Sequence, residues 1–200
     1  MHMFQTAPGC FIPYPDQLRE EYVVREGHSI LANISFPHLG PFVQAFYQAL
    51  SEPLFFVLQL PLSAQEERLL YHPQGKIHQE VLYLEQQSRE QIAAIMEAYG
   101  SLLLADGISQ FAIASHESGE EIFVQSYKVT SLFSPAPRNL IPLLTRFGLR
   151  EVPRLTTAWD TFTPAVSGRC RRVCYEGLDA WMVAEELKKQ GMYRYEVIAE

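Results

Sequence analysis

Residues 108–134, ISQFAIASHESGEEIFVQSYKVTSLFS, carry the pattern that decides the fold class. Two runs, 108–115 and 120–134, alternate with a period of two, which is typical of strands with one buried face. At their junction lies the segment SHESGEE, in which Gly119 suits the positive φ that a tight turn needs. The pattern therefore predicts a hairpin of two antiparallel strands.

The rest of the chain mixes strand and helix signals without the regular alternation of βαβ units. Further strand patterns are YVVREGHSILANISF (22–36, two short strands), PLFFVLQLPL (53–62), EVLYLE (80–85), RCRRVCYEG (169–177) and MYRYEVIAE (192–200). Helical patterns are 39–51, 63–70 opened by Ser63 and Glu66, 88–107 opened by Ser88 and Gln91, 139–149 capped by Asn139, and 178–191 capped by Asp179. We expect an α+β fold, with a mostly antiparallel sheet flanked by about four to five helices.

The domain organisation expected from this pattern is simple. Residues 1–20 form an irregular N-terminal arm, and residues 21–200 form a single α+β domain. The stretch YHPQGKIHQE leaves a subdivision near 71–80 open, because it is the most loop-like segment in the interior of the chain.

The charge of the chain is acidic and uneven. The net charge is −7, and the acidic excess lies within residues 1–149. This charge argues against binding to nucleic acid or to an anionic membrane. An acidic face would suit a basic protein partner, whereas the alternative reading is that the charge serves solubility alone.

The cysteines and the signals for compartment point to a reduced, cytoplasmic protein. Cys10, Cys170 and Cys174 make no disulfide framework, and the latter two are expected to be small core residues. No secretory signal pattern and no apolar run of bilayer length is present. The common nucleotide-binding, hydrolase and zinc-protease motifs are also missing, so we expect no cofactor and no metal.

The turn at 115–121 is the first candidate site. His116 beside Glu117 or Glu120 would be an acid–base pair or the start of a metal site. A metal would need further ligands from His72, His78 or Asp160, which are distant in the sequence. The simpler interpretation is a hairpin turn whose glutamates, Glu121 included, are solvated charges.

The loop LTTAWDTFTP, residues 155–164, is the second candidate site. Trp159 and Phe162 lie beside Asp160 and several threonines where no regular element is expected, a composition that suits a recognition surface. The alternative is that Trp159 fills the core while Asp160 caps a turn through neighbouring amides.

A resemblance rests on three segments, SHESGEEIFVQSYKV, LTTAWDTFTP and EELKKQGMY. Together they make residues 88–200 similar in general texture to small bacterial immunity proteins, which neutralise toxins. The resemblance implies a single cytosolic α+β domain, often acidic, that acts by binding a partner and not by catalysis.

Three functional hypotheses follow. The first is a non-catalytic protein-binding module, immunity-like or regulatory, whose acidic surface comprises Glu117, Glu120, Glu121, Trp159 and Asp160. The second is a small-molecule-binding domain or enzyme in which His116, Glu117 and Asp160 converge in a pocket. The third is a structural homodimer that pairs through the strand at 53–62 or through the last strand.

Overall fold

A computed structural model describes residues 3–25, 28–70 and 77–199. The strands of this part of the chain are β1 (Cys10–Phe11), β2 (Glu21–Arg25), β3 (Ser29–Ala32), β4 (Leu54–Pro61), β5 (His78–Gln87), β6 (Gln110–Ser115), β7 (Glu120–Val124), β8 (Thr130–Phe133), β9 (Arg150–Glu151), β10 (Arg169–Cys170) and β11 (Tyr193–Ala199). Its helices are α1 (Phe36–Tyr47), α2 (Ala64–Leu70), α3 (Arg89–Ala105), α4 (Ile141–Arg146) and α5 (Ala180–Lys188), with short 3-10 turns η1 (Pro15–Gln17), η2 (Ser126–Lys128), η3 (Pro137–Leu140) and η4 (Ala158–Thr161).

The main sheet confirms the predicted α+β class. Its strand order is β11-β5-β4-β6-β7-β8-β3-β2-β9, and every neighbouring pair is antiparallel except β2 and β9. The predicted hairpin is β6–β7, with Phe111 opposite Val124 and Ser115 opposite Glu120. Because β4 lies between β5 and β6, the strand expected at 53–62 is internal and offers no free edge for the homodimer proposed through it.

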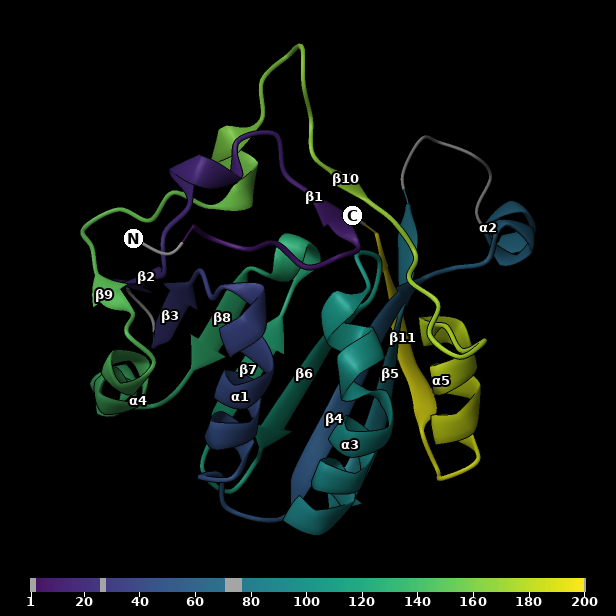
Figure 1. The fold of residues 1–200 in the computed structure, drawn as a ribbon. Coiled ribbons are helices and arrows are strands. Elements are labelled where there is room, and N and C mark those ends of the chain that lie inside the picture. Colours follow the sequence, from purple (N-terminus) through teal and green to yellow (C-terminus); the bar gives the residue numbers. More distant parts are fainter. Residues whose placement is uncertain (1–2, 26–27, 71–76, 200) are drawn as a thin grey trace.

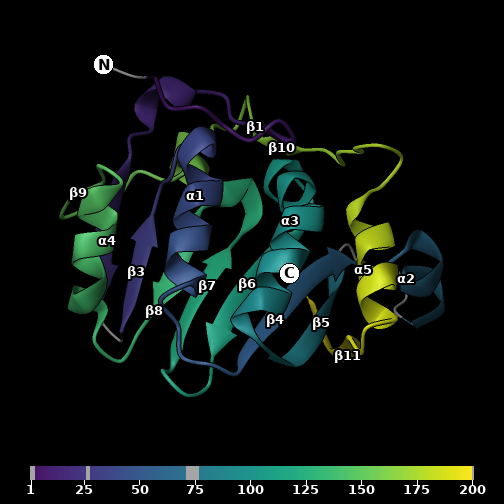
Figure 2. The same ribbon diagram turned by 60° about the horizontal axis from the view of Figure 1, so that its bottom comes forward.

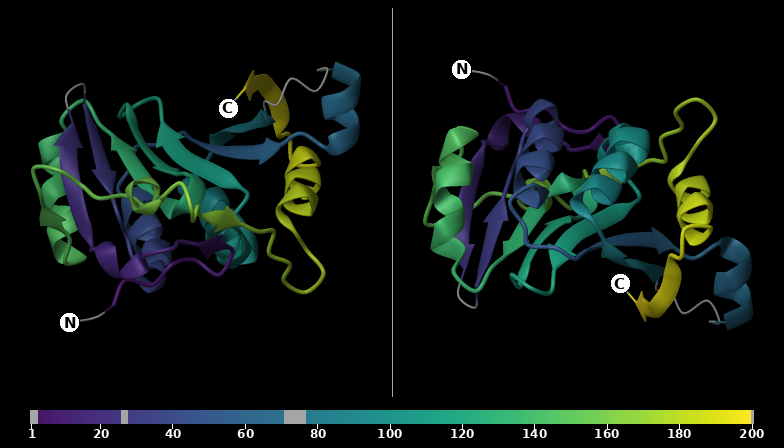
Figure 3. Two further views of the ribbon diagram at one scale, coloured as in Figure 1. Left: turned by 90° about the horizontal axis from the view of Figure 1, so that it is seen from above. Right: turned by 90° about the horizontal axis from the view of Figure 1, so that it is seen from below.

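The helices cover one face of this sheet. Figures 1 and 2 show α1 and α3 side by side on it, with α4 near one end of the sheet and α5 near the other. Phe42 and Phe46 of α1 are fully buried over the sheet, where Phe56 of β4 stacks on Phe111 of β6 at 5.9 Å. Figure 3 shows the two ends from above and below, with α4 beyond β2 and with α2 and α5 beside β11.

Three of the four predicted capping signals form at the starts of their helices, α2, α3 and α5. Ser88 and Gln91 form the predicted capping box at α3, and Asp179 accepts from the backbone N–H of Met182 at α5. The exception is α4, which begins at Ile141, so Asn139 lies within η3 and is not its cap. Proline at position 137 sets up the preceding 3-10 turn, which displaces the helix start.

The predicted strand at 169–177 is largely wrong. Only Arg169 and Cys170 pair as a strand, with β1. Arg171 still donates its N–H to the Gly9 carbonyl, but the backbone then turns to the loop after α3, where Val173 donates its N–H to the Asp106 carboxylate at 2.7 Å. Cys174 is consequently exposed, and Cys170 is only partly buried, which corrects their expected place in the core.

The N-terminal arm packs against the start of α1 and against a separate apolar cluster. Gln5 donates its N–H to the Ser35 hydroxyl at 2.9 Å and accepts from the N–H of Phe36 at 2.9 Å. The buried Ile12 and Leu18 belong to a cluster that also contains Leu31, Val129, Leu155 and Ala158. Of the stretch 71–80, residues 71–76 lie outside the described part of the chain, and His78 opens β5 of the same sheet. Within the described part, no helix has both the length and the apolar character to cross a membrane.

Candidate functional site

The turn between β6 and β7 is shorter than predicted. Gly119 has the expected positive φ of 65°, but β7 already begins at Glu120, so Glu120 and Glu121 are strand residues. Glu120 accepts a hydrogen bond from the Ser134 hydroxyl at 3.0 Å. Glu121 is half-buried, and desolvation raises the pKa of its carboxyl group. The sequence suggested that Glu117, Glu120 and Glu121 are all solvated charges. Of these three, only Glu117 is exposed.

The structure does not bring His116 and Asp160 together. The His116 ring stacks on Phe55, with 4.4 Å between centroids, before β7 begins. Trp159, next to Asp160, contacts Tyr127, which follows the other end of β7. Five strand residues span roughly 16 Å, so the turn and the loop lie at opposite ends of that strand.

The candidate metal ligands that the structure describes, His78, His116 and Asp160, do not come together as a metal site. Within the described part of the chain, no group of three His, Cys, Asp or Glu side chains is placed to hold a metal ion. His78 bonds to Glu67 at 2.6 Å, and His72 lies outside the described residues.

The 155–164 loop contains a capped turn and an exposed tryptophan. The Asp160 carboxylate accepts from the backbone N–H of Thr157 at 2.8 Å and from its hydroxyl at 2.7 Å. Both bonds lower the pKa of Asp160, and the bond from the backbone N–H has the larger effect. Asp160 therefore caps the turn, as the alternative interpretation proposed. Trp159, however, does not fill the core, because it is 53% exposed.

Trp159 is exposed but held in place by two other rings. Tyr127 and Phe162 meet it edge to face, with centroid distances of 4.7 and 5.4 Å. Gly168 lies flat against this group, since a Cβ atom there would come within 2.2 Å of the Phe162 ring. A rigid, exposed tryptophan of this kind loses little conformational entropy when a partner covers it.

Next to this cluster, β1 and the segment that begins with β10 present an exposed phenylalanine and two arginines. Phe11 is 53% exposed, and the guanidinium of Arg169 lies over its ring at 5.9 Å. Arg171 follows on the same segment and is exposed as well. We call Phe11, Trp159, Arg169 and Arg171 the aromatic–arginine surface. Two of them, Phe11 and Arg169, lie on β1 and β10, near the top of Figure 1, and Arg171 directly follows β10.

Beneath this surface, two consecutive residues adopt a left-handed backbone. Tyr127 and Lys128 have φ values of 55° and 60°, a conformation that is costly for residues other than glycine. It turns Lys128 inward, where its Nζ donates to the carbonyl oxygens of Leu103 at 2.9 Å and Ser109 at 3.1 Å. Burial lowers the pKa of this lysine.

Two cysteines face each other beside Lys128. Cys10 of β1 lies opposite Cys170 of β10, and the Cys10 thiol donates a hydrogen bond to the Cys170 sulfur. That bond lowers the pKa of Cys170 to about 7, with further help from the hydroxyl and backbone N–H of Tyr127 and from the Lys128 charge. The same bond and burial raise the pKa of Cys10. Nothing in the local sequence signals this pairing, because the partners lie near opposite ends of the chain.

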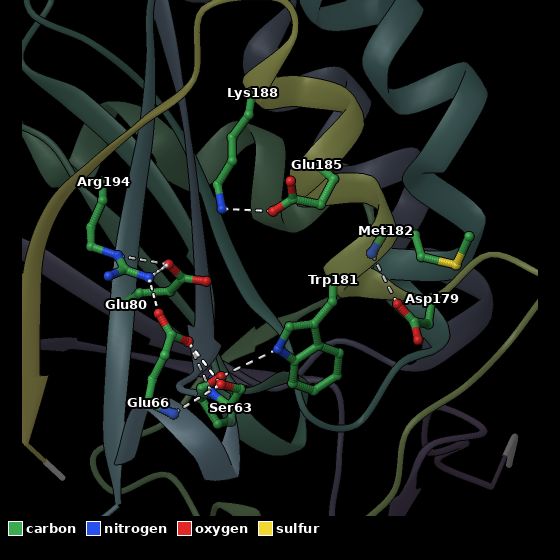
Figure 4. A network of polar contacts seen from close by, with 10 residues as sticks. Ser63, Glu66, Glu80, Asp179, Trp181, Met182, Glu185, Lys188 and Arg194 are labelled. Atoms are coloured by element: carbon green, nitrogen blue, oxygen red, sulfur yellow. Dashed lines mark hydrogen bonds and ion pairs between the residues drawn. The ribbon is translucent and has the colours of Figure 1, made fainter. Parts of the chain in front are cut away.

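A second polar cluster, shown in Figure 4, has a structural role. Arg194 of β11 donates to the nearly buried Glu80 of β5 at 2.6 and 2.8 Å and to Glu66 of α2 at 2.9 Å. Trp181 of α5 donates its indole N–H to the Pro61 carbonyl at 3.3 Å. These charges compensate one another and join α2 and β11 to β5, so we assign the cluster to the fold.

Comparison with known proteins identifies no relative. No protein-family model, no curated protein and no solved structure matches this chain.

Proposed function

We propose that the protein is a non-catalytic binding module that holds a protein partner against its aromatic–arginine surface. Trp159 carries this proposal: it is 53% exposed, yet edge-to-face contacts with two rings hold it in one orientation. Tryptophan, tyrosine and arginine dominate the residues at which protein interfaces gain most of their binding energy. Binding of a partner, without catalysis, is also the mode of action that the immunity-like resemblance implies.

The proposed partner is acidic at its contact site. Glu120 and Asp160, expected to face a basic partner, are hydrogen-bonded within the fold, and Glu121 is half-buried. The exposed charges beside Phe11 are instead those of Arg169 and Arg171. Complementary charge then favours carboxylates on the partner, although the chain as a whole is acidic.

Affinity capture with matched variants tests this proposal. The tagged chain is compared with Trp159→Ala and with Tyr195→Ala, which removes a 60% exposed aromatic residue on β11, away from the surface. We expect Trp159→Ala to lose one stoichiometric protein that Tyr195→Ala retains, with both variants melting like the wild type. Equal capture by the two variants would contradict the proposal.

Charge reversal then identifies the chemistry of the partner. Arg169→Glu should weaken capture of the same protein, whereas Glu117→Lys, in the exposed β6–β7 turn, should leave it unchanged. The opposite result would support the basic partner that the net charge of −7 suggests.

A homodimer through β11 is a second candidate. In the described part of the chain this strand is the last of the sheet and pairs with β5 alone, so its outer edge offers a surface for a second copy. Tyr193 and Tyr195 on it are 43% and 60% exposed. Mass measurement in solution tests this candidate, and a monomer at high concentration would contradict it.

A further inference from the structure

We propose that Cys10 and Cys170 form a thiol–disulfide exchange site for an anionic low-molecular-weight disulfide. The two residues are directly opposite each other in the antiparallel β1–β10 pair. The neighbouring pair is the hydrogen-bonded one, because Arg171 donates its N–H to the Gly9 carbonyl at 2.8 Å. Cys10 and Cys170 therefore occupy a non-hydrogen-bonded position, where Cα atoms lie roughly 4.5 Å apart. A disulfide spans roughly 4.4–6.8 Å between Cα atoms.

Close backbone contacts hold this register. Gly107 donates its N–H to the Arg171 carbonyl at 3.0 Å, and Gly9 donates to the Ala105 carbonyl at 2.7 Å. A Cβ atom on Gly107 would come within 2.0 Å of the Gly9 oxygen. The end of α3 thus fixes both strands, and the thiols meet without movement of the backbone.

The surroundings assign different roles to the two thiols. Cys170 is partly exposed, and its sulfur accepts hydrogen bonds from Tyr127 and from the Cys10 thiol. Donors of this kind stabilise a thiolate, which is the form that attacks a disulfide. Cys10 is only 5% exposed and donates to Cys170, so it is the resolving thiol. The left-handed backbone at Tyr127 and Lys128 places both the hydroxyl donor and the buried cation at this pair.

A cavity lined by residues of the β1–β10 pair points to the substrate class. It has a volume of about 520 Å³, and Cys10, Cys170, Phe11, Arg169 and Arg171 are among the residues that line it. The two arginines favour a disulfide that carries carboxylates. Glutathione disulfide has this chemistry and is the probe for the test.

The exchange proceeds in two balanced steps. The Cys170 thiolate attacks one sulfur of X–S–S–X; a Cys170–S–S–X bond forms, and X–S⁻ leaves with the electron pair and takes up a proton. Cys10 then releases its proton to solvent, and its sulfur attacks Cys170 Sγ and expels the second X–S⁻. Two protein thiols become one disulfide, while X–S–S–X is reduced to two X–SH.

The experiment uses the full chain with Cys174→Ser, which removes the exposed third thiol. The reduced protein is treated with glutathione disulfide near neutral pH and analysed by intact mass and peptide mapping. We expect a loss of two hydrogens and a bond between the peptides that contain Cys10 and Cys170. Adding Cys10→Ser should trap one glutathione on Cys170, and adding Cys170→Ser should leave Cys10 unmodified.

Two further results decide the proposal. If Cys10 and Cys170 both stay alkylatable under conditions that oxidise a simple dithiol, or if Cys10→Ser carries no glutathione on Cys170, the exchange site is refuted. Neutral hydroxyethyl disulfide should react several-fold more slowly than glutathione disulfide, and Arg169→Gln with Arg171→Gln should remove that difference. Equal rates in the starting protein would overturn the preference for an anionic substrate.

Discussion

The ring of Tyr127 meets the ring of Trp159 edge to face, with 4.7 Å between centroids and 84° between planes. The hydroxyl and the backbone N–H of the same tyrosine are donors to Cys170. One residue, in a left-handed conformation with a φ of 55°, thus supports both the exposed tryptophan and the thiol pair.

Removing only the hydroxyl of Tyr127 should separate these two roles. Tyr127→Phe keeps the ring against Trp159 but removes one donor to the Cys170 sulfur. We expect the pKa of Cys170 to rise above about 7, because its thiolate loses stabilisation. The pH dependence of Cys170 alkylation, read by peptide mapping, measures the shift. Tyr175→Phe, at an exposed tyrosine, is the control; an unchanged profile in Tyr127→Phe would count against the hydroxyl contact.

Replacing Glu121 should stabilise the protein at neutral pH. Desolvation raises the pKa of this half-buried carboxyl group, so the folded state holds its proton more tightly than the unfolded state. Stability contributed by that proton is present at low pH and is lost as the pH rises through the raised pKa. Glu121→Gln should therefore melt at a higher temperature than the wild type at pH 7, and this difference in melting temperature should disappear below the usual pKa of glutamate. Glu117→Gln, at an exposed site, should melt at the same temperature as the wild type.

Removing the Asp160 cap should destabilise the 158–161 turn. Its carboxylate accepts two hydrogen bonds from Thr157, and loss of a cap costs about 1 kcal/mol. The pKa of Asp160 is lowered in the fold, so its contribution is present above the usual pKa of aspartate and is lost as the pH falls through the lowered value. Urea unfolding of Asp160→Ala should show the full deficit at pH 7 and a smaller one in acid. A deficit that persists unchanged in acid would exclude the ionised cap as its cause.

Filling Gly107 should disturb the register of the thiol pair. Gly107→Ala places a methyl group within 2.0 Å of the Gly9 oxygen, and overpacking of this kind costs about 1–3 kcal/mol. The register shift should also slow disulfide formation between Cys10 and Cys170. Gly40→Ala in α1 is the matched control, because its nearest atom, at 3.2 Å, ends the flexible Leu104 side chain. Equal melting temperatures for the two variants would contradict the close backbone approach.

The sequence by itself determined the features that depend on neighbouring residues. The β6–β7 hairpin follows from a period of two around Gly119, and the α3 capping box follows from Ser88 and Gln91, three residues apart. Such signals involve hydrogen bonds and side-chain directions within one turn or strand, so they can be read directly along the chain. The α+β class followed from these local elements together.

Only the tertiary structure decided the candidate sites. Glu121 is adjacent in sequence to a turn, yet the sheet half-buries it, and Asp160 is committed to Thr157 and lies far from His116. Cys10 meets Cys170 because the end of α3 holds β1 against β10. Contacts between segments this far apart depend on how whole elements pack, and packing leaves no periodic trace in the residues on either side.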